Sequence, residues 1–171
     1  MKNKNELGIY IHIPFCVHKC IYCDFLSSPA DEKTRKRYVK ALIREINLAA
    51  EGKTNRCINK CNNENNNKSN NYGKDIVTSI FIGGGTPSVI DASDIKDIIE
   101  AVRHNYNVSD EAEITIECNP GTMDEKKAAI YRQAGINRIS FGLQSTNNNE
   151  LRMLGRIHTY EQFLESLRIA E

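Results

Sequence analysis

Two hydrophobic periods alternate along the chain. The segments 9–13, 76–82, 113–117 and 137–143 are mostly apolar or place an apolar residue at every second position, which is typical of β-strands. Between and after them, apolar residues recur at three- and four-residue spacing, which predicts amphipathic helices over 31–51, 95–102, 124–134 and 159–171. Asp91 or Ser93 is the expected N-cap of the second helix, and Gly135 ends the third.

Four strand–helix units in succession predict an α/β fold. Parallel strands joined by right-handed helical crossovers form either an open, doubly wound sheet or part of a barrel. In both architectures ligands bind at the carboxyl ends of the strands. The residues suited to chemistry follow the predicted strands at these ends: Cys16 to Cys23, Gly83 to Thr86, Glu117 to Pro120, and Gln144.

The segment 53–74 differs in composition from the rest of the chain. It contains nine Asn between Asn55 and Asn71 and few apolar side chains. Such a segment buries too little apolar surface to offset the conformational entropy that ordering costs. We therefore expect an Asn-rich, disordered loop inserted in the domain. Cys57 and Cys61 within it have no acidic or His partners in register, so exposed free thiols are favoured over a second metal site.

The overall composition predicts one soluble domain. The chain has 171 residues, of which 40% are hydrophobic and 26% charged, and single domains usually run to about 100 to 150 residues. No apolar run approaches the roughly 18 residues of a membrane span, and the N-terminus lacks the apolar core of a signal peptide. We expect no transmembrane segment and a cytoplasmic location. The net charge of +1 gives no reason to expect a nucleic-acid partner.

Three of the six cysteines cluster after the first strand as C-x3-C-x2-C: Cys16, Cys20 and Cys23. Without a secretory signal, clustered cysteines indicate metal ligands or reactive thiols rather than disulfides. Three thiolates leave one metal position without a protein ligand. A cubic iron–sulfur cluster suits such an incomplete set. A zinc site completed by His18 would be strained, because His18 lies between two of the cysteines; zinc and merely structural thiols remain the alternatives.

Five ordered motifs give the chain a family resemblance. It resembles the radical S-adenosylmethionine proteins, and more narrowly the group of oxygen-independent coproporphyrinogen III oxidases and haem chaperones. The motifs cover nearly the whole chain outside the Asn-rich loop. They are Tyr10 to Phe25 with its three cysteines, Ile82-Gly-Gly-Gly-Thr-Pro-Ser88, Glu117-Cys-Asn-Pro-Gly-Thr122, Ser140-Phe-Gly-Leu-Gln-Ser145, and Gly155-Arg-Ile-His158.

The resemblance implies a [4Fe-4S] cluster on Cys16, Cys20 and Cys23, with S-adenosylmethionine chelating the fourth iron and being cleaved reductively to a radical. The resemblance also assigns residues that contact S-adenosylmethionine. These are Tyr10, Tyr22, Gly84, Gly85, Thr86, Glu117, Gln144 and Arg156. Plainer interpretations exist for some of them: a tight turn for the glycines, core packing for the tyrosines, and a surface position for the arginine.

Three further residues belong to these motifs without an assigned chemical role. His12 and His158 are family-motif residues to which the sequence gives no function. Cys118 stands where the family usually has a small residue, and a buried, inert thiol is the favoured interpretation.

Two functions compete within this group. The favoured one is a haem chaperone, which keeps the cluster and S-adenosylmethionine, binds haem or a porphyrin, and delivers haem to a recipient haem protein. The alternative is an oxygen-independent coproporphyrinogen III oxidase, an oxidoreductase of porphyrin biosynthesis that decarboxylates propionates by radical chemistry. Such oxidases typically carry another Cys where this chain has Phe25, and a longer segment before the first cluster Cys than the 15 residues before Cys16.

The resemblance also implies a partial TIM-like radical S-adenosylmethionine barrel. Such barrels have six strand–helix units, and this chain supplies the first four. Residues 1–171 are therefore expected to form an incomplete, N-terminal part of the core domain, with the Asn-rich loop inserted in it.

Overall fold

A computed structural model of the protein describes residues 5–51 and 75–171. The predicted Asn-rich loop over 53–74, with Cys57 and Cys61, lies outside these residues, so the predictions for that segment stay predictions. Within the described residues, no helix is long and apolar enough to cross a membrane.

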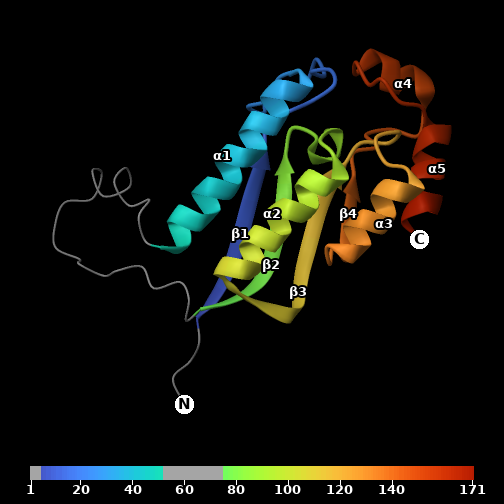
Figure 1. Ribbon diagram of the computed structural model, residues 1–171. Helices are drawn as coiled ribbons and strands as arrows, with labels where there is room; N and C mark the ends of the chain where they lie inside the picture. Colours follow the sequence, from blue (N-terminus) through green and yellow to red (C-terminus); the bar gives the residue numbers. More distant parts are fainter. Residues whose placement is uncertain (1–4, 52–74) are drawn as a thin grey trace.

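The sheet has four parallel strands in chain order, as the alternating pattern predicts. They are β1 (Glu6–Ile13), β2 (Ile76–Gly84), β3 (Asn107–Cys118) and β4 (Arg138–Phe141). Each strand pairs with the next one along the chain, and helices connect them. This arrangement confirms the predicted α/β class. It also brings the four carboxyl ends to one edge of the sheet (Figure 1).

The helices form a layer against one face of the sheet (Figure 1). In chain order the helices are α1 (Glu32–Ala50), α2 (Ala92–Asn105), α3 (Glu125–Gln133), α4 (Asn148–Met153) and α5 (Tyr160–Ala170). Side-chain N-caps begin α1, α3 and α5. Asp31 accepts a hydrogen bond from the Thr34 amide, and Asp124 accepts one from the Lys127 amide. Thr159 and Gln162 form a capping box at α5.

Strand register separates an apolar face from a polar face. Ile11, Ile82, Ile116 and Ile139 are aligned across the four strands, and the first three are at most 2% exposed. Ile11, Ile82 and Ile116 belong to the core beneath the helices, and Ile139 packs against this core. Because side chains alternate along a strand, the adjacent positions face the other side of the sheet. That side carries the polar and small residues Tyr10, His12, Gly83, Glu117 and Ser140.

Some element boundaries differ from the predicted ones. Strand β4 is shorter than the predicted 137–143, because the Leu143 amide turns back to the Phe141 carbonyl at 3.1 Å and Gln144 has a positive φ of 76°. A short helix, α4, was not predicted. A 3-10 turn, η3 (Pro87–Val89), follows the glycines of β2.

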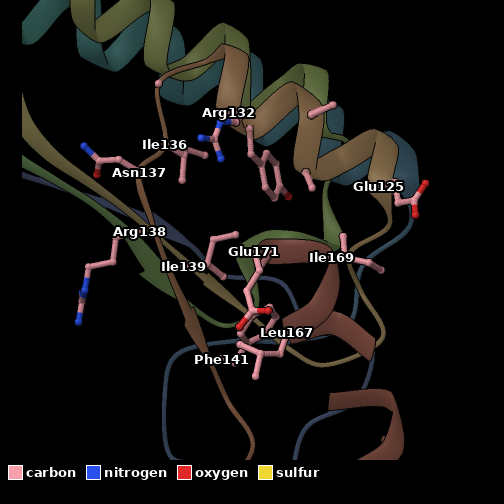
Figure 2. A pocket seen from close by; sticks show the side chains of 15 residues that line it. Glu125, Arg132, Ile136, Asn137, Arg138, Ile139, Phe141, Leu167, Ile169 and Glu171 are labelled. Atoms are coloured by element: carbon pink, nitrogen blue, oxygen red, sulfur yellow. The ribbon is translucent and has the colours of Figure 1, made fainter. Parts of the chain in front are cut away.

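A groove of about 700 Å³ lies beside β4, between α3 and α5 (Figure 2). It is distinct from the predicted site, because none of the three clustered cysteines lines it. Apolar side chains such as Ile139, Phe141 and Leu167 contribute most of its surface. Tyr131 also lines it, and the buried Tyr131 hydroxyl has no hydrogen-bond partner.

Candidate functional site

The carboxyl ends of the strands enclose a second cavity of about 260 Å³. The cysteine loop, the end of β2, the end of β3 and the segment after β4 all contribute to its wall. Ten of the eleven predicted site residues line it; only Tyr10 does not. The ten are Cys16, Cys20, Tyr22, Cys23, Gly84, Gly85, Thr86, Glu117, Gln144 and Arg156.

The cysteine loop is fixed at both ends. The Cys16 amide donates to the Ser28 carbonyl at 3.2 Å, and the Ser28 amide donates to the Pro14 carbonyl at 3.1 Å. Phe15 is 5% exposed and packs edge-on against Tyr38. The three cysteines between these anchors are half-buried and not disulfide-bonded. The loop therefore presents three accessible thiols on a fixed base.

The glycines after β2 allow the cysteine loop to approach closely. A Cβ on Gly85 would lie 2.6 Å from the Phe15 carbonyl oxygen and 3.0 Å from Cys16 Sγ. Gly84 has a φ of +116°, a conformation that side chains rarely adopt. The sequence led us to expect close approach of a ligand at these glycines. In the structure, part of that space belongs to the cysteine loop itself.

Glu117 faces the cavity from β3. Its Oε2 accepts a hydrogen bond from the Gly84 amide at 3.0 Å, and Cβ on Gly83 would lie 2.8 Å from the same oxygen. The carboxylate therefore joins the carboxyl ends of β2 and β3. Glu117 therefore lies on the face of the sheet opposite the helices.

Arg156 reaches the cavity from the segment after α4. Its Nη2 donates to the Gly142 carbonyl at 2.6 Å and to Asn119 Oδ1 at 2.7 Å. Its Nη1 lies 3.4 Å from Cys20 Sγ and 3.5 Å from the Tyr22 hydroxyl. The Nε atom is buried and has no hydrogen-bond partner within residues 5–51 and 75–171. Arg156 is therefore a half-buried cation at the cysteines rather than an ordinary surface arginine.

Asn119 is a site residue that the sequence reasoning did not single out. Its Nδ2 donates to Thr86 Oγ1 at 2.9 Å, and its Oδ1 accepts from Arg156. It lines the cavity beside Glu117. The only signal in the sequence was its place in the Glu117-Cys-Asn-Pro motif, because an Asn after a strand is more often a turn residue.

The two histidines without assigned roles hold loops. His12 Nε2 lies 3.2 Å from the Leu26 carbonyl, which can only accept, so Nε2 carries the proton and Nδ1 accepts from the Tyr10 hydroxyl at 2.9 Å. His158 Nε2 donates to the Leu143 carbonyl at 3.2 Å. Tyr10 is 59% exposed and stacks on Phe81, so core packing does not describe it.

Cys118 differs from the three clustered cysteines, because its thiol is buried. It is 2% exposed, and burial raises the pKa of its thiol to about 12. A thiol with so high a pKa is protonated and unreactive at neutral pH. The expectation of a buried, inert thiol is confirmed.

The donor set fits an iron–sulfur cluster better than a single metal ion. Among residues 5–51 and 75–171, no three His, Cys, Asp or Glu side chains are placed around one metal-ion position, as a closed zinc site requires. Three half-buried thiols instead stand apart around one cavity, with a guanidinium beside one of them. Soft sulfur ligands spread around a larger group are what a cluster needs.

The radical SAM superfamily model matches residues 67–171, more than half of the chain. The chain belongs to the radical SAM superfamily, whose members use a [4Fe-4S] cluster and S-adenosylmethionine. The relatives found by sequence include proteins from one group of this superfamily, the haem chaperones. The chain is 36% identical over 165 residues to the haem chaperone HemW of Escherichia coli K12, and 34% identical over 166 residues to that of Haemophilus influenzae.

Comparison with a solved structure supports the fold. The chain is similar to coproporphyrinogen III oxidase (HemN) from Escherichia coli, a radical SAM enzyme, with a TM-score of 0.81 and 26% identity over 98% of the chain. The sequence matches cover 96% of this chain and 39% of each haem chaperone. The chain therefore spans about two fifths of the length of these relatives.

Proposed function

We propose that the chain is the cluster-binding part of a haem chaperone. Cys16, Cys20 and Cys23 would hold a [4Fe-4S] cluster, and the remaining residues of the cavity would hold S-adenosylmethionine. The observation that carries this proposal is the convergence of ten predicted residues, from five separate segments, on one cavity.

The proposed binding roles follow from the chemistry of each group. Arg156 is a cation with a buried, unpartnered Nε, so it can pair with the carboxylate of S-adenosylmethionine. The Glu117 carboxylate and the Gln144 side chain line the cavity and supply acceptors for the amino or hydroxyl groups of this cofactor. When bound, the cofactor pair supplies one-electron chemistry, and the chain contributes position and exclusion of water.

Sequence likeness favours the chaperone over the oxidase. Identity to the haem chaperones of Escherichia coli and Haemophilus influenzae is 36% and 34%, against 26% to the coproporphyrinogen oxidase structure. Phe25, at the position where oxidases typically carry another Cys, is 67% exposed beside the cavity. The proposed ligand is haem or a porphyrin, and the proposed partner is a protein that receives haem.

Anaerobic reconstitution tests the cofactor part of this proposal. Iron and sulfide analysis is expected to give four of each per chain, by the composition of the cluster. Equilibrium dialysis with S-adenosylmethionine is then expected to show binding that Arg156→Met weakens at least tenfold. Arg152→Met, on the exposed side of α4, is the matched control and is expected to bind normally. A chain that retains zinc instead of iron contradicts the proposal.

A paired assay separates the two functions. On the reconstituted protein, haem titration followed by visible absorbance is expected to saturate. Anaerobic incubation with coproporphyrinogen III, S-adenosylmethionine and a reductant is expected to release no CO2 above a no-enzyme blank. CO2 release without haem binding would assign the oxidase activity instead.

A further inference from the structure

A line of hydrogen bonds connects two of the three clustered cysteines. Thr86 Oγ1 donates to Cys16 Sγ at 3.5 Å, and Thr86 Oγ1 accepts from Asn119 Nδ2 at 2.9 Å. Asn119 Oδ1 accepts from Arg156 Nη2 at 2.7 Å, and Arg156 Nη1 donates to Cys20 Sγ at 3.4 Å. We call Thr86, Asn119 and Arg156 the sulfur belt.

The direction of each bond in the sulfur belt is fixed by chemistry. Arginine can only donate, so the Asn119 carbonyl oxygen must face Arg156 and the Asn119 amide nitrogen must face Thr86. The Thr86 hydroxyl accepts from that nitrogen, which leaves its own hydrogen for Cys16 Sγ. Both ends of the sulfur belt therefore present a donor to a cysteine sulfur.

Asn119 is held in place by its own backbone. Its carbonyl accepts from both the amide and the hydroxyl of Thr122, at 3.1 and 2.6 Å. Its amide donates to Ser88 Oγ at 3.4 Å, and Ser88 is fully buried. The side chain thus starts from a fixed turn, which orients both of its hydrogen bonds in advance.

We propose that the sulfur belt raises the reduction potential of the cluster, with Asn119 as the positioning residue at its centre. This inference rests on the proposed [4Fe-4S] cluster on the three cysteines. Reduction adds negative charge, which spreads onto the cysteine sulfurs. Donors aimed at these sulfurs stabilise the reduced state more than the oxidised state.

The effect is concentrated on two of the three ligands. Cys16 receives a hydroxyl donor and Cys20 receives a charged donor, which makes a stronger hydrogen bond. Within the described residues, Cys23 Sγ receives no side-chain hydrogen bond. Because the donors share Asn119, loss of that one side chain disturbs both.

The test is the midpoint potential of the reconstituted cluster without S-adenosylmethionine, measured by an anaerobic redox titration. Asn119→Leu keeps the side-chain size and removes both hydrogen bonds. We expect its cluster to be at least tenfold harder to reduce, a downward shift of about 59 mV for one electron. Asn107→Leu, at the exposed opposite end of β3, is the control and is expected to keep the wild-type potential.

A second variant isolates one end of the sulfur belt. Thr86→Val removes the donor to Cys16 at nearly constant shape and is expected to shift the potential in the same direction by a smaller amount. Full iron and sulfide content with unchanged potentials in both variants would overturn the inference. Loss of the cluster in both variants, with the control intact, would also overturn it, because the belt would then be structural. A wild-type chain that assembles no cluster would instead refute the proposed function.

Discussion

The Glu117 carboxylate accepts a hydrogen bond from the Gly84 amide at 3.0 Å, across the ends of two neighbouring strands. The bond holds the Gly84 backbone at a φ of +116°, a conformation that glycine adopts readily and residues with a side chain rarely adopt. It also orients the carboxylate toward the cavity. A single contact therefore positions both the glycine at the end of β2 and the acidic group at the end of β3.

Gly84→Ala is expected to lower the free energy of unfolding by about 1–3 kcal/mol, because it combines a strained backbone with crowding. The new Cβ would lie 2.7 Å from ring atoms of His12. Gly121→Ala is the control, because Gly121 also has a positive φ but its Cβ would meet nothing closer than 3.7 Å. Urea unfolding measures both. Equal losses in the two variants would mean that the crowding at His12 has no effect.

Cys20→Ala is expected to abolish the brown chromophore of the reconstituted protein. Four cysteines line the cavity, and Cys20 is one of the three that belong to the C-x3-C-x2-C loop. A cluster held by these three ligands has no substitute for a lost one. Cys118→Ala is the matched control and is expected to keep the full spectrum, because Cys118 is buried and protonated. An unaltered spectrum in Cys20→Ala would rule out this ligand set.

Lys127 is expected to be a structural residue beneath the site. Its Nζ donates to the carbonyls of Ser88 at 2.7 Å, Thr122 at 3.2 Å and Ile90 at 3.4 Å, and burial lowers its pKa. Lys127→Met leaves these carbonyls without their donor. We expect a loss of about 1–3 kcal/mol in the free energy of unfolding.

The neighbouring Lys126 is exposed and provides the control for this change. Lys126→Met is expected to alter the free energy of unfolding by less than about 0.5 kcal/mol. Thermal or urea unfolding distinguishes the two. If Lys127→Met is as stable as Lys126→Met, the three carbonyl contacts make no net contribution.

Because the pKa of His158 is lowered in the folded protein, we expect the free energy of unfolding to fall on acidification. Burial, and then the nearby Arg156 charge, lower its pKa below the ordinary value of 6.5. The unfolded chain therefore binds a proton at a pH where the folded chain does not, so stability falls as the pH drops through about 6.5 toward the folded pKa. His158→Gln is expected to flatten this dependence between pH 7.5 and 5.5.

The comparison for His158 is His104→Gln, which changes an exposed histidine near the end of α2. This variant is expected to keep the wild-type slope of unfolding free energy against pH. Urea unfolding at each pH gives the slopes. A steep slope that survives in His158→Gln would assign the pH dependence to another group.

Periodicity was sufficient to predict the main elements of this fold. The isoleucines of β1 and β3 alternate cleanly, and Asp31, Asp124 and Thr159 are side chains that begin helices. The short helix α4 escaped detection because two Asn residues occupy its first turn and six residues are too few for a helical period. Strand β4 ends early because of a local turn, and no sequence period encodes such a turn.

Individual site residues could be predicted from the sequence only where they belong to a recognisable motif. The cysteine spacing, the glycines and Glu117 were recognisable in the sequence, and the structure brings them to one cavity. Asn119 was not recognisable, because its importance lies in two partners that are distant in the chain, Thr86 and Arg156. Roles that depend on contacts between segments need the fold before they can be assigned.

The outer edge of β4 is expected to make the 171-residue chain self-associate. Among the described residues β4 pairs only with β3, so the other side of the strand presents unpaired backbone donors and acceptors. The adjacent groove of about 700 Å³ is largely apolar (Figure 2). Tyr131 also lines it, and its buried hydroxyl has no hydrogen-bond partner among the described residues. Within the described residues, this edge of the sheet is therefore open to another strand.

A charge placed on this edge is expected to reduce the association, because a lysine opposes burial of the groove against another strand. Ile139→Lys changes a groove-lining residue of β4. Met153→Lys is the control, because Met153 is 75% exposed on α4 and does not line the groove. Light scattering across a range of protein concentrations is expected to show wild type and Met153→Lys associating while Ile139→Lys stays monomeric. A wild-type chain that is monodisperse at every concentration would show that the edge is protected in solution and does not drive association.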